Sequence, residues 1–119
     1  MLPTCPSCLT IKPSPIHNLG VFATKFIPRG TNLGRFEGRE MTYKEFNALY
    51  KKDYTYCYQL MRQHKVIEAK NPRNWITYVN ENRVRPNVAL KSRHCYAILD
   101  IQEGEELVLD YGYNYPRDY

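Results

Sequence analysis

The sequence predicts a β-rich α+β domain, and three observations support this fold class. Short runs of β-branched and aromatic residues alternate with glycine and proline turns along most of the chain. Tyrosine, which favours strands and carries a polar group, occurs 11 times, against four phenylalanines and one tryptophan. Helical signals are confined to one or two short segments, so the sequence is typical of many small strands with little helix.

The length predicts a single domain. The chain has 119 residues, and one domain usually takes about 100–200. Its 43% hydrophobic and 24% charged residues are ordinary for a soluble globular fold, which excludes a wholly disordered chain. Residues 1–15 hold four of the eight prolines and are expected to be an irregular or edge segment, followed by the folded domain over residues 16–119.

Each expected element has a local signal. Thr42 and Glu45 have the spacing of a capping box, which predicts a helix over residues 43–50. Apolar and β-branched runs between turn residues predict strands at 19–23, 32–37, 65–69, 95–99 and 106–110.

A tyrosine-rich stretch is predicted to form one more strand. Tyr54, Tyr56 and Tyr58 alternate, which would place three phenols on one face. The following stretch, residues 71–87, is expected to be mainly loop around an apolar cluster that begins at Trp75.

The net charge of +5 is unevenly distributed. Residues 62–93 carry eight basic and two acidic side chains, whereas residues 100–118 carry six acidic side chains and one arginine. Such a balance suits an anionic partner in the middle and a basic partner near the end, although solvated loops would show the same composition.

The cysteines and the first residues indicate an intracellular protein without a metal site. The start lacks the basic and apolar regions of a secretory signal, and no apolar run approaches the roughly 20 residues of a membrane span. Cysteines in such a protein are expected to be reduced. Cys5 and Cys8 form a lone Cys-x-x-Cys, which is half of a zinc site, and no second pair has suitable spacing.

Several phrases occur in a fixed order and together carry the functional signal. No dinucleotide-binding, phosphate-loop or nucleophile-elbow motif is present. Instead the chain contains Asn-Leu-Gly-Val-Phe-Ala at 18–23, Phe-Glu-Gly-Arg at 36–39, Val-Ile-Glu-Ala at 66–69, Asn-Trp-Ile-Thr-Tyr-Val-Asn at 74–80, and Asp-Ile-x-x-Gly-Glu-Glu-Leu-x-x-Asp-Tyr-Gly at 100–112. In this order and spacing the set resembles a SET domain, the catalytic module of protein lysine methyltransferases. The phrases at 36–39 and 74–75 are similar to those of its PR subfamily.

The resemblance implies a fold and a cofactor. The fold would consist of small curved β-sheets with a C-terminal pseudoknot, in which the segment after Leu109 passes beneath the loop that contains Asn80. Asn80, Asn87 and Asn114 are expected to satisfy backbone groups at this crossing. The cofactor would be S-adenosyl-L-methionine.

The resemblance also implies site residues. Gly20, Val21, Phe22, Asn80 and Glu81 match cofactor-binding positions, with Glu81 standing where the family commonly has histidine. Glycine suits a place where a ligand approaches the main chain closely. Tyr111 of the Asp-Tyr-Gly phrase matches the catalytic tyrosine and a cofactor contact, and Tyr54, Tyr56 and Tyr113 are expected to line the channel for the substrate lysine.

The expected function is therefore methylation of protein lysines, with a basic peptide such as a histone tail as substrate. The expected location is the nucleus, or the host nucleus for a viral or bacterial chain, as a monomer or homodimer that needs no nucleic acid or membrane. Two alternatives stay open. One is a catalytically weak SET/PR-like interaction module; the other is a small basic domain that binds single-stranded nucleic acid through the tyrosine strand.

Overall fold

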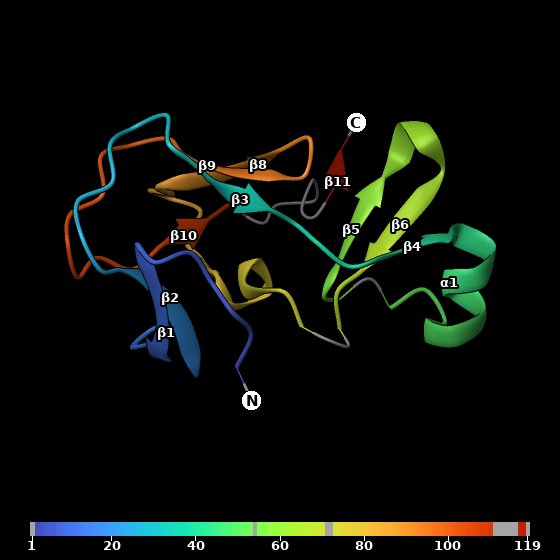
Figure 1. Cartoon of the computed structure of the whole chain (residues 1–119). Helices are drawn as coiled ribbons and strands as arrows, with labels where there is room; N and C mark the ends of the chain where they lie inside the picture. The colour runs from blue at the N-terminus through green and yellow to red at the C-terminus, as the bar shows by residue number, and fades with distance from the viewer. Residues whose placement is uncertain (1, 54, 71–72, 111–116, 119) are drawn as a thin grey trace.

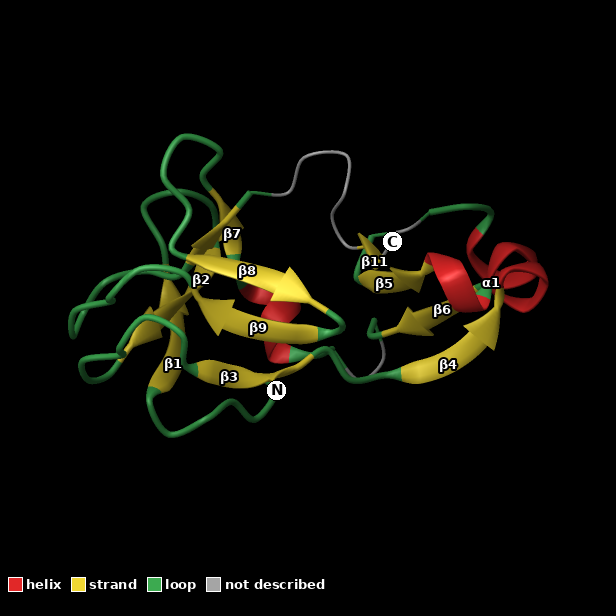
Figure 2. Cartoon of the chain, turned by 90° about the horizontal axis from the view of Figure 1, so that it is seen from above, coloured by secondary structure: helices red, strands yellow, loops and turns green. Residues whose placement is uncertain are grey.

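The computed structural model describes residues 2–53, 55–70, 73–110 and 117–118, which form three small sheets (Figure 1). The first sheet is the antiparallel pair β1 (Leu9–Pro13) and β2 (Leu19–Ala23). It lies at one end of the molecule, and helix α1 (Tyr43–Tyr50) lies at the other (Figures 1 and 2). This agrees with the predicted β-rich α+β fold class.

The second sheet has five strands in the order β3-β9-β8-β10-β7. Strand β10 lies between β7 and β8 and runs parallel to both, although it follows them in the chain. The sheet therefore places the segment before residue 110 between two strands that flank the loop of residues 82–87. Its strands are β3 (Asn32–Arg35), β7 (Asn80–Glu81), β8 (Val88–Lys91), β9 (His94–Ala97) and β10 (Val108–Leu109).

The third sheet has four strands in the order β11-β5-β6-β4 and packs against α1. Its strands are β4 (Arg39–Thr42), β5 (Cys57–Leu60), β6 (Lys65–Glu68) and β11 (Arg117–Asp118). The 3-10 helix η1 (Met61–Gln63) connects β5 with β6. Strand β11 pairs in parallel with β5 and forms one edge of the third sheet, so residues 117–118 near the C-terminus belong to this sheet (Figure 2).

Helix α1 begins with the predicted capping box. The Glu45 N–H donates to Thr42 Oγ1 and the Thr42 N–H donates to Glu45 Oε1, each at a distance of 3.1 Å. These bonds satisfy two donors that a helix start leaves without partners, and they lower the pKa of Glu45. The helix ends at Lys51 in a left-handed conformation, with φ of 50°. Phe46 is its buried residue and joins Met41, Cys57 and Val66 in a small apolar cluster.

The main core is formed by residues of all three sheets and of the 3-10 helix η2 (Trp75–Tyr78). Asn74 caps η2, because its Oδ1 accepts a hydrogen bond of 3.0 Å from the Ile76 N–H. Trp75 and Ile76 are then buried together with Val21, Phe36 and Leu107. The stretch of residues 71–87, expected to be mainly loop, thus contains η2 and β7, and its apolar side chains are part of the core.

Two local expectations need comment. Residues 1–15, expected to be an irregular or edge segment, contain the edge strand β1, which accommodates Pro13 at its last residue. The three alternating tyrosines do not share a strand face: β5 begins at Cys57, and Tyr56 precedes it with a left-handed φ of 61°. Tyr58 is fully buried against Phe36, with ring centroids 5.6 Å apart, and Tyr54 lies outside the described residues.

Candidate cofactor site

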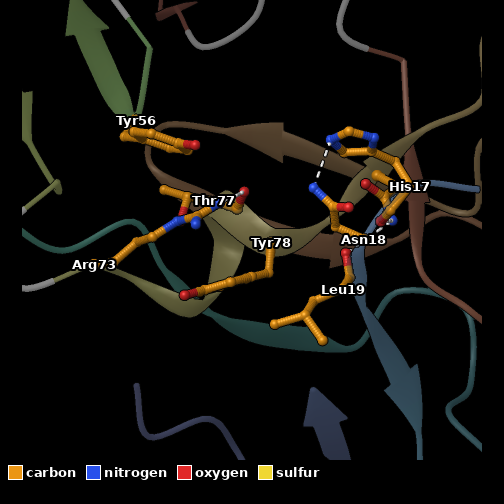
Figure 3. Close-up of a pocket in the computed structure, with 8 residues that line it drawn as sticks. His17, Asn18, Leu19, Tyr56, Arg73, Thr77 and Tyr78 are labelled. Atoms are coloured by element: carbon orange, nitrogen blue, oxygen red, sulfur yellow. Dashed lines mark hydrogen bonds between the residues drawn. The ribbon is translucent and has the colours of Figure 1, made fainter. Parts of the chain in front are cut away.

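A cavity of about 370 Å³ lies where the start of β2, the segment before β5, and the stretch from η2 to β7 meet (Figure 3). This volume falls within the roughly 300–1,000 Å³ of small-molecule sites. The residues that line it are His17, Asn18, Leu19, Tyr56, Arg73, Thr77, Tyr78 and Asn80.

The side chain of Asn80 holds the loop before β2 in place. Its Nδ2 lies 3.2 Å from the main-chain oxygen of His17 and 3.1 Å from that of Leu19. Asn80 is only 8% exposed, so its amide, which needs hydrogen-bond partners when buried, finds two of them in this loop. The turn is closed further by a 2.8 Å hydrogen bond from the Ser14 N–H to the Asn18 oxygen, with Asn18 at a φ of 40°.

The positively charged side chain of Arg73 forms part of the cavity wall. The guanidinium of Arg73 lies between the rings of Tyr56 and Tyr78, with its Cζ 4.1 Å and 3.7 Å from the two ring centroids (Figure 3). Arg73 Nε donates a hydrogen bond of 2.8 Å to Thr77 Oγ1, and Nη2 donates one of 3.2 Å to the main-chain oxygen of Thr77. Ring stacking and these bonds fix the guanidinium, while no described residue accepts from Nη1.

Gly20, Val21 and Phe22, predicted as cofactor-binding positions, are not among the residues that line the cavity. Val21 and Phe22 are 0% and 7% exposed and belong to the apolar interior, and only backbone atoms of this part of β2 are suited to contact a ligand. At Gly20 the close neighbour is a carboxylate: an added Cβ would overlap Glu106 Oε2. Leu19, one residue earlier, lines the cavity instead.

Glu81 does not line the cavity. Its Oε2 accepts a 2.7 Å bond from Arg83 Nε in an ion pair whose side chains are 31% and 69% exposed. An ion pair this open contributes little to stability. The tyrosines Tyr111, Tyr54 and Tyr113 lie outside the described residues, so Tyr56 is the predicted channel residue that the structure places at the cavity.

Sequence reasoning missed Arg73, Thr77, Tyr78 and Glu106. Arg73 precedes η2 and Thr77 lies within it, four residues later, and this spacing was the available signal. Glu106 lies in the Gly-Glu-Glu-Leu phrase, but its contact with Asn80 joins residues 26 apart and has no local signature.

Asn87 satisfies backbone groups of the segment that enters β10, as predicted for the asparagines near this part of the fold. Asn87 Nδ2 donates to the Glu106 main-chain oxygen over 2.9 Å, and its Oδ1 accepts from the Val108 N–H over 2.8 Å. Asn87 thereby binds the backbone on both sides of Leu107, immediately before β10. Asn114 lies outside the described residues.

Within the described residues, no three His, Cys, Asp or Glu side chains are grouped so as to hold a metal ion. No helix in that part of the chain is long and apolar enough to cross a membrane.

The four cysteines are free thiols and are expected to differ in reactivity. Burial raises the pKa of Cys57 and of Cys95 to about 12, helped at Cys57 by the carboxylates of Asp53 and Glu68. Burial and the neighbouring Cys8 also raise the pKa of Cys5, but Cys5 and Cys8 are only half-buried, so iodoacetamide at pH 8 should reach and modify them before the buried Cys57 and Cys95. Peptide mass spectrometry over time would measure this order, and early labelling of Cys57 or Cys95 in folded protein would contradict it.

Comparison with known proteins supports the architecture. The sequence profile of the SET domain matches residues 18–112. PR domain zinc finger protein 14 from Mus musculus is 29% identical over 111 residues, which cover 86% of this chain and 19% of that protein. The chain therefore spans about a fifth of the length of this curated relative.

Two solved structures share the fold. The methyltransferase domain of human PR domain-containing protein 2 matches with a TM-score of 0.67 and 26% identity, covering 87% of this chain and 76% of that one. A humanized mutant of the Chaetomium thermophilum Polycomb Repressive Complex 2, bound to the inhibitor GSK126, matches with a TM-score of 0.74 and 23% identity, covering 91% and 15%. Since the SET profile spans most of the residues and the described strands follow the same arrangement, the chain belongs to the SET domain family of methyltransferases.

Proposed function

We propose that this protein is an S-adenosylmethionine-dependent protein lysine N-methyltransferase. The observation that carries the proposal is the cavity at the start of β2, in which a fixed guanidinium, two phenol rings and the Asn80 amide converge within a SET domain. A few placed polar groups in a concave site are typical of ligand recognition.

The cavity residues fit the chemistry of the proposed cofactor. S-adenosylmethionine has a carboxylate and an ammonium group on its methionine part and a cationic sulfonium beside them. Arg73 can donate to the carboxylate, since no described residue uses its Nη1 hydrogens, and charge-assisted bonds of this kind are strong. The faces of Tyr56 and Tyr78 are suited to positive charge, although Arg73 already occupies one face of each.

When bound, the cofactor supplies an electrophilic methyl group on a sulfonium sulfur. The protein must hold the substrate lysine uncharged and in line, because an ammonium group has no lone pair and the free lysine pKa is about 10.4. A channel of aromatic side chains disfavours the charged form by excluding water and fixes the nitrogen in position. We assign this channel to Tyr54, Tyr56 and Tyr113, and the orienting hydroxyl to Tyr111, from the family resemblance.

A basic peptide, such as a histone tail, is the proposed substrate, and the nucleus is the proposed location. Asp100, Glu105 and Glu106 line a second cavity of about 500 Å³ together with Arg85. Its lining holds three carboxylates and one guanidinium, a balance that favours lysine-rich and arginine-rich peptides over acidic ones.

The proposal is tested first by calorimetry with S-adenosylmethionine on chelator-treated protein. Binding at micromolar to submillimolar concentration is expected without added metal. The second measurement is transfer of a labelled methyl group to core histones and histone-tail peptides, with mass spectrometry to locate the modified lysine. Absence of binding at millimolar cofactor would contradict the proposal.

A catalytically weak SET/PR-like interaction module is a second candidate. Glu81 stands where the family commonly has histidine, and it is engaged with Arg83 away from the cavity. This candidate predicts peptide binding that is independent of S-adenosylmethionine and no methyl transfer in the same assays.

Arg73→Ala is expected to weaken cofactor binding by about tenfold, because one charge-assisted hydrogen bond is lost along with the packing between two rings. Arg73→Lys should recover only part of the affinity, since an ammonium cannot stack or bind two oxygens as a guanidinium does. Calorimetry measures both effects. Arg29→Ala, which removes an exposed guanidinium from the turn before β3, is the matched control; equal losses in the two alanine variants would argue against a local role for Arg73.

A further inference from the structure

Four separate segments meet at the carboxylate of Glu106, which lies beside the candidate cofactor site. Ser14 Oγ lies 2.8 Å from both carboxylate oxygens, and Asn80 Nδ2 lies 2.8 Å from Oε2. Phe22 of β2 forms an isolated antiparallel bridge with Glu106. The carboxylate therefore connects the β1–β2 turn and the start of β7 with the segment that leads into β10, and the main chain of Glu106 pairs with β2.

The carboxylate also explains why residue 20 is glycine. The φ angle of Gly20 is outside the left-handed region, so its backbone conformation would accept any residue. Its surroundings would not: an added Cβ would overlap Glu106 Oε2 and lie 3.0 Å from both Glu106 Cδ and Ser14 Cβ. A side chain at position 20 would thus displace a hydrogen-bonded protein carboxylate, which is a second reason for glycine beside the close approach of a ligand that the family resemblance implies.

The contacts of Asn80 fix which way its amide points. Nδ2 has three acceptors within reach, namely Glu106 Oε2 and the main-chain oxygens of His17 and Leu19. None of the three can donate while Glu106 is ionised, so the NH2 group must face them. The other end, Oδ1, accepts no hydrogen bond from the described residues, and Asn80 lines the cavity.

We propose that Glu106 is a positioning residue that, together with the main-chain oxygens of His17 and Leu19, orients the Asn80 amide, so that Asn80 offers a hydrogen-bond acceptor to the ammonium group of an amino-acid ligand, and that this same carboxylate favours glycine at position 20. The ligand part rests on the proposed function. The orientation of Asn80 and the requirement at Gly20 are properties of the protein alone.

The orientation is tested by NMR on uniformly ¹⁵N-labelled protein. Glu106→Gln keeps the side-chain shape and removes the charge, and Gln can still bond Ser14, whose hydroxyl can accept as well as donate. The two Asn80 side-chain amide protons are expected to move upfield and to exchange faster with solvent in this variant. Glu103→Gln, which neutralises an exposed carboxylate three residues away, should leave them unchanged. Unchanged Asn80 resonances in folded Glu106→Gln protein would overturn the proposal.

The glycine requirement is tested by a double-mutant cycle in urea. Gly20→Ala should be clearly more destabilising in the unaltered protein than when combined with Glu106→Ala, which removes the Glu106 atoms nearest to the added Cβ and leaves the contact with Ser14 Cβ. Equal destabilisation in both backgrounds would overturn the assignment of Glu106 as the cause.

The ligand part is tested by calorimetry with S-adenosylmethionine. Glu106→Gln is expected to weaken binding about tenfold at an unchanged melting temperature, and Glu103→Gln to have no effect. Full affinity in Glu106→Gln would overturn this part. If the unaltered protein binds no cofactor, the proposed function is wrong, whereas the NMR comparison and the urea cycle still decide whether Glu106 positions Asn80.

Discussion

Replacing Tyr111 with phenylalanine is expected to lower the rate of methyl transfer by about 10²-fold or more, the usual cost of losing a hydrogen bond made in the transition state. The resemblance of Asp110-Tyr111-Gly112 to the family's catalytic phrase assigns the hydroxyl to orienting the reacting amine. Because the ring is kept, cofactor affinity and fold should change little. Mass spectrometry of a methylated histone-tail peptide gives the rate, and calorimetry and circular dichroism give the other two quantities.

Tyr96→Phe is the matched control for Tyr111→Phe. Tyr96 lies on β9, where its ring contacts His94 at a centroid distance of 6.1 Å, and it does not line the cavity. Removing its hydroxyl should leave the rate unchanged. Tyr54→Phe and Tyr56→Phe are expected instead to change the number of methyl groups added, since a lost channel hydroxyl makes room beside the amine. A folded, cofactor-binding Tyr111→Phe protein that methylates at the unaltered rate would show that the catalytic assignment is wrong.

Elements with strong local signals were predictable from the sequence. Strand β2 and helix α1 have the predicted bounds, Leu19–Ala23 and Tyr43–Tyr50. In α1 the signal is a capping box whose two hydrogen bonds join residues three apart, so no distant contact is needed to define the start.

The tyrosine stretch shows where a local pattern fails. Asp53 Oδ1 accepts hydrogen bonds from both the N–H and the hydroxyl of Thr55, which forms a turn and lowers the pKa of Asp53. The turn leaves Tyr56 with a left-handed backbone, and the strand begins only at Cys57. Tyr58 is then buried by contacts from far along the chain, including a 3.2 Å bond in which the Arg93 N–H donates to its hydroxyl. Alternation alone cannot reveal such contacts.

The candidate site also combines a residue that the sequence predicts with residues that only tertiary contacts bring into place. Asn80 was predicted as a site residue by the family phrase, and it lines the cavity. The placement of Arg73 depends on two rings, Tyr56 and Tyr78, that come from different elements. The role of Glu106 depends on β10 lying between β7 and β8, a crossing that hydrophobic periodicity does not encode. Residues that act through tertiary contacts are therefore the part that required the structure.

Asn87→Ala is expected to lower the free energy of unfolding by about 2–6 kcal/mol, since one buried and one partly buried backbone group each lose a partner at about 1–3 kcal/mol. The groups are the Glu106 oxygen and the Val108 N–H, bonded to Asn87 over 2.9 Å and 2.8 Å. Asn87 is 6% exposed, so water cannot easily replace its amide. Urea unfolding followed by circular dichroism would measure the change.

Asn82→Ala is the matched control in the same loop. Asn82 Oδ1 also accepts two backbone hydrogen bonds, from Val84 and Arg85, but at an exposed turn where water can take its place. Its loss should cost less than about 1 kcal/mol. Asn87→Asp should be as harmful as Asn87→Ala, because the new carboxylate can accept from Val108 but faces the Glu106 oxygen without a donor. If the Asn82 and Asn87 alanine variants unfold at the same urea concentration, the main-chain pairing of β10 with its neighbours holds the crossing without help from the asparagine.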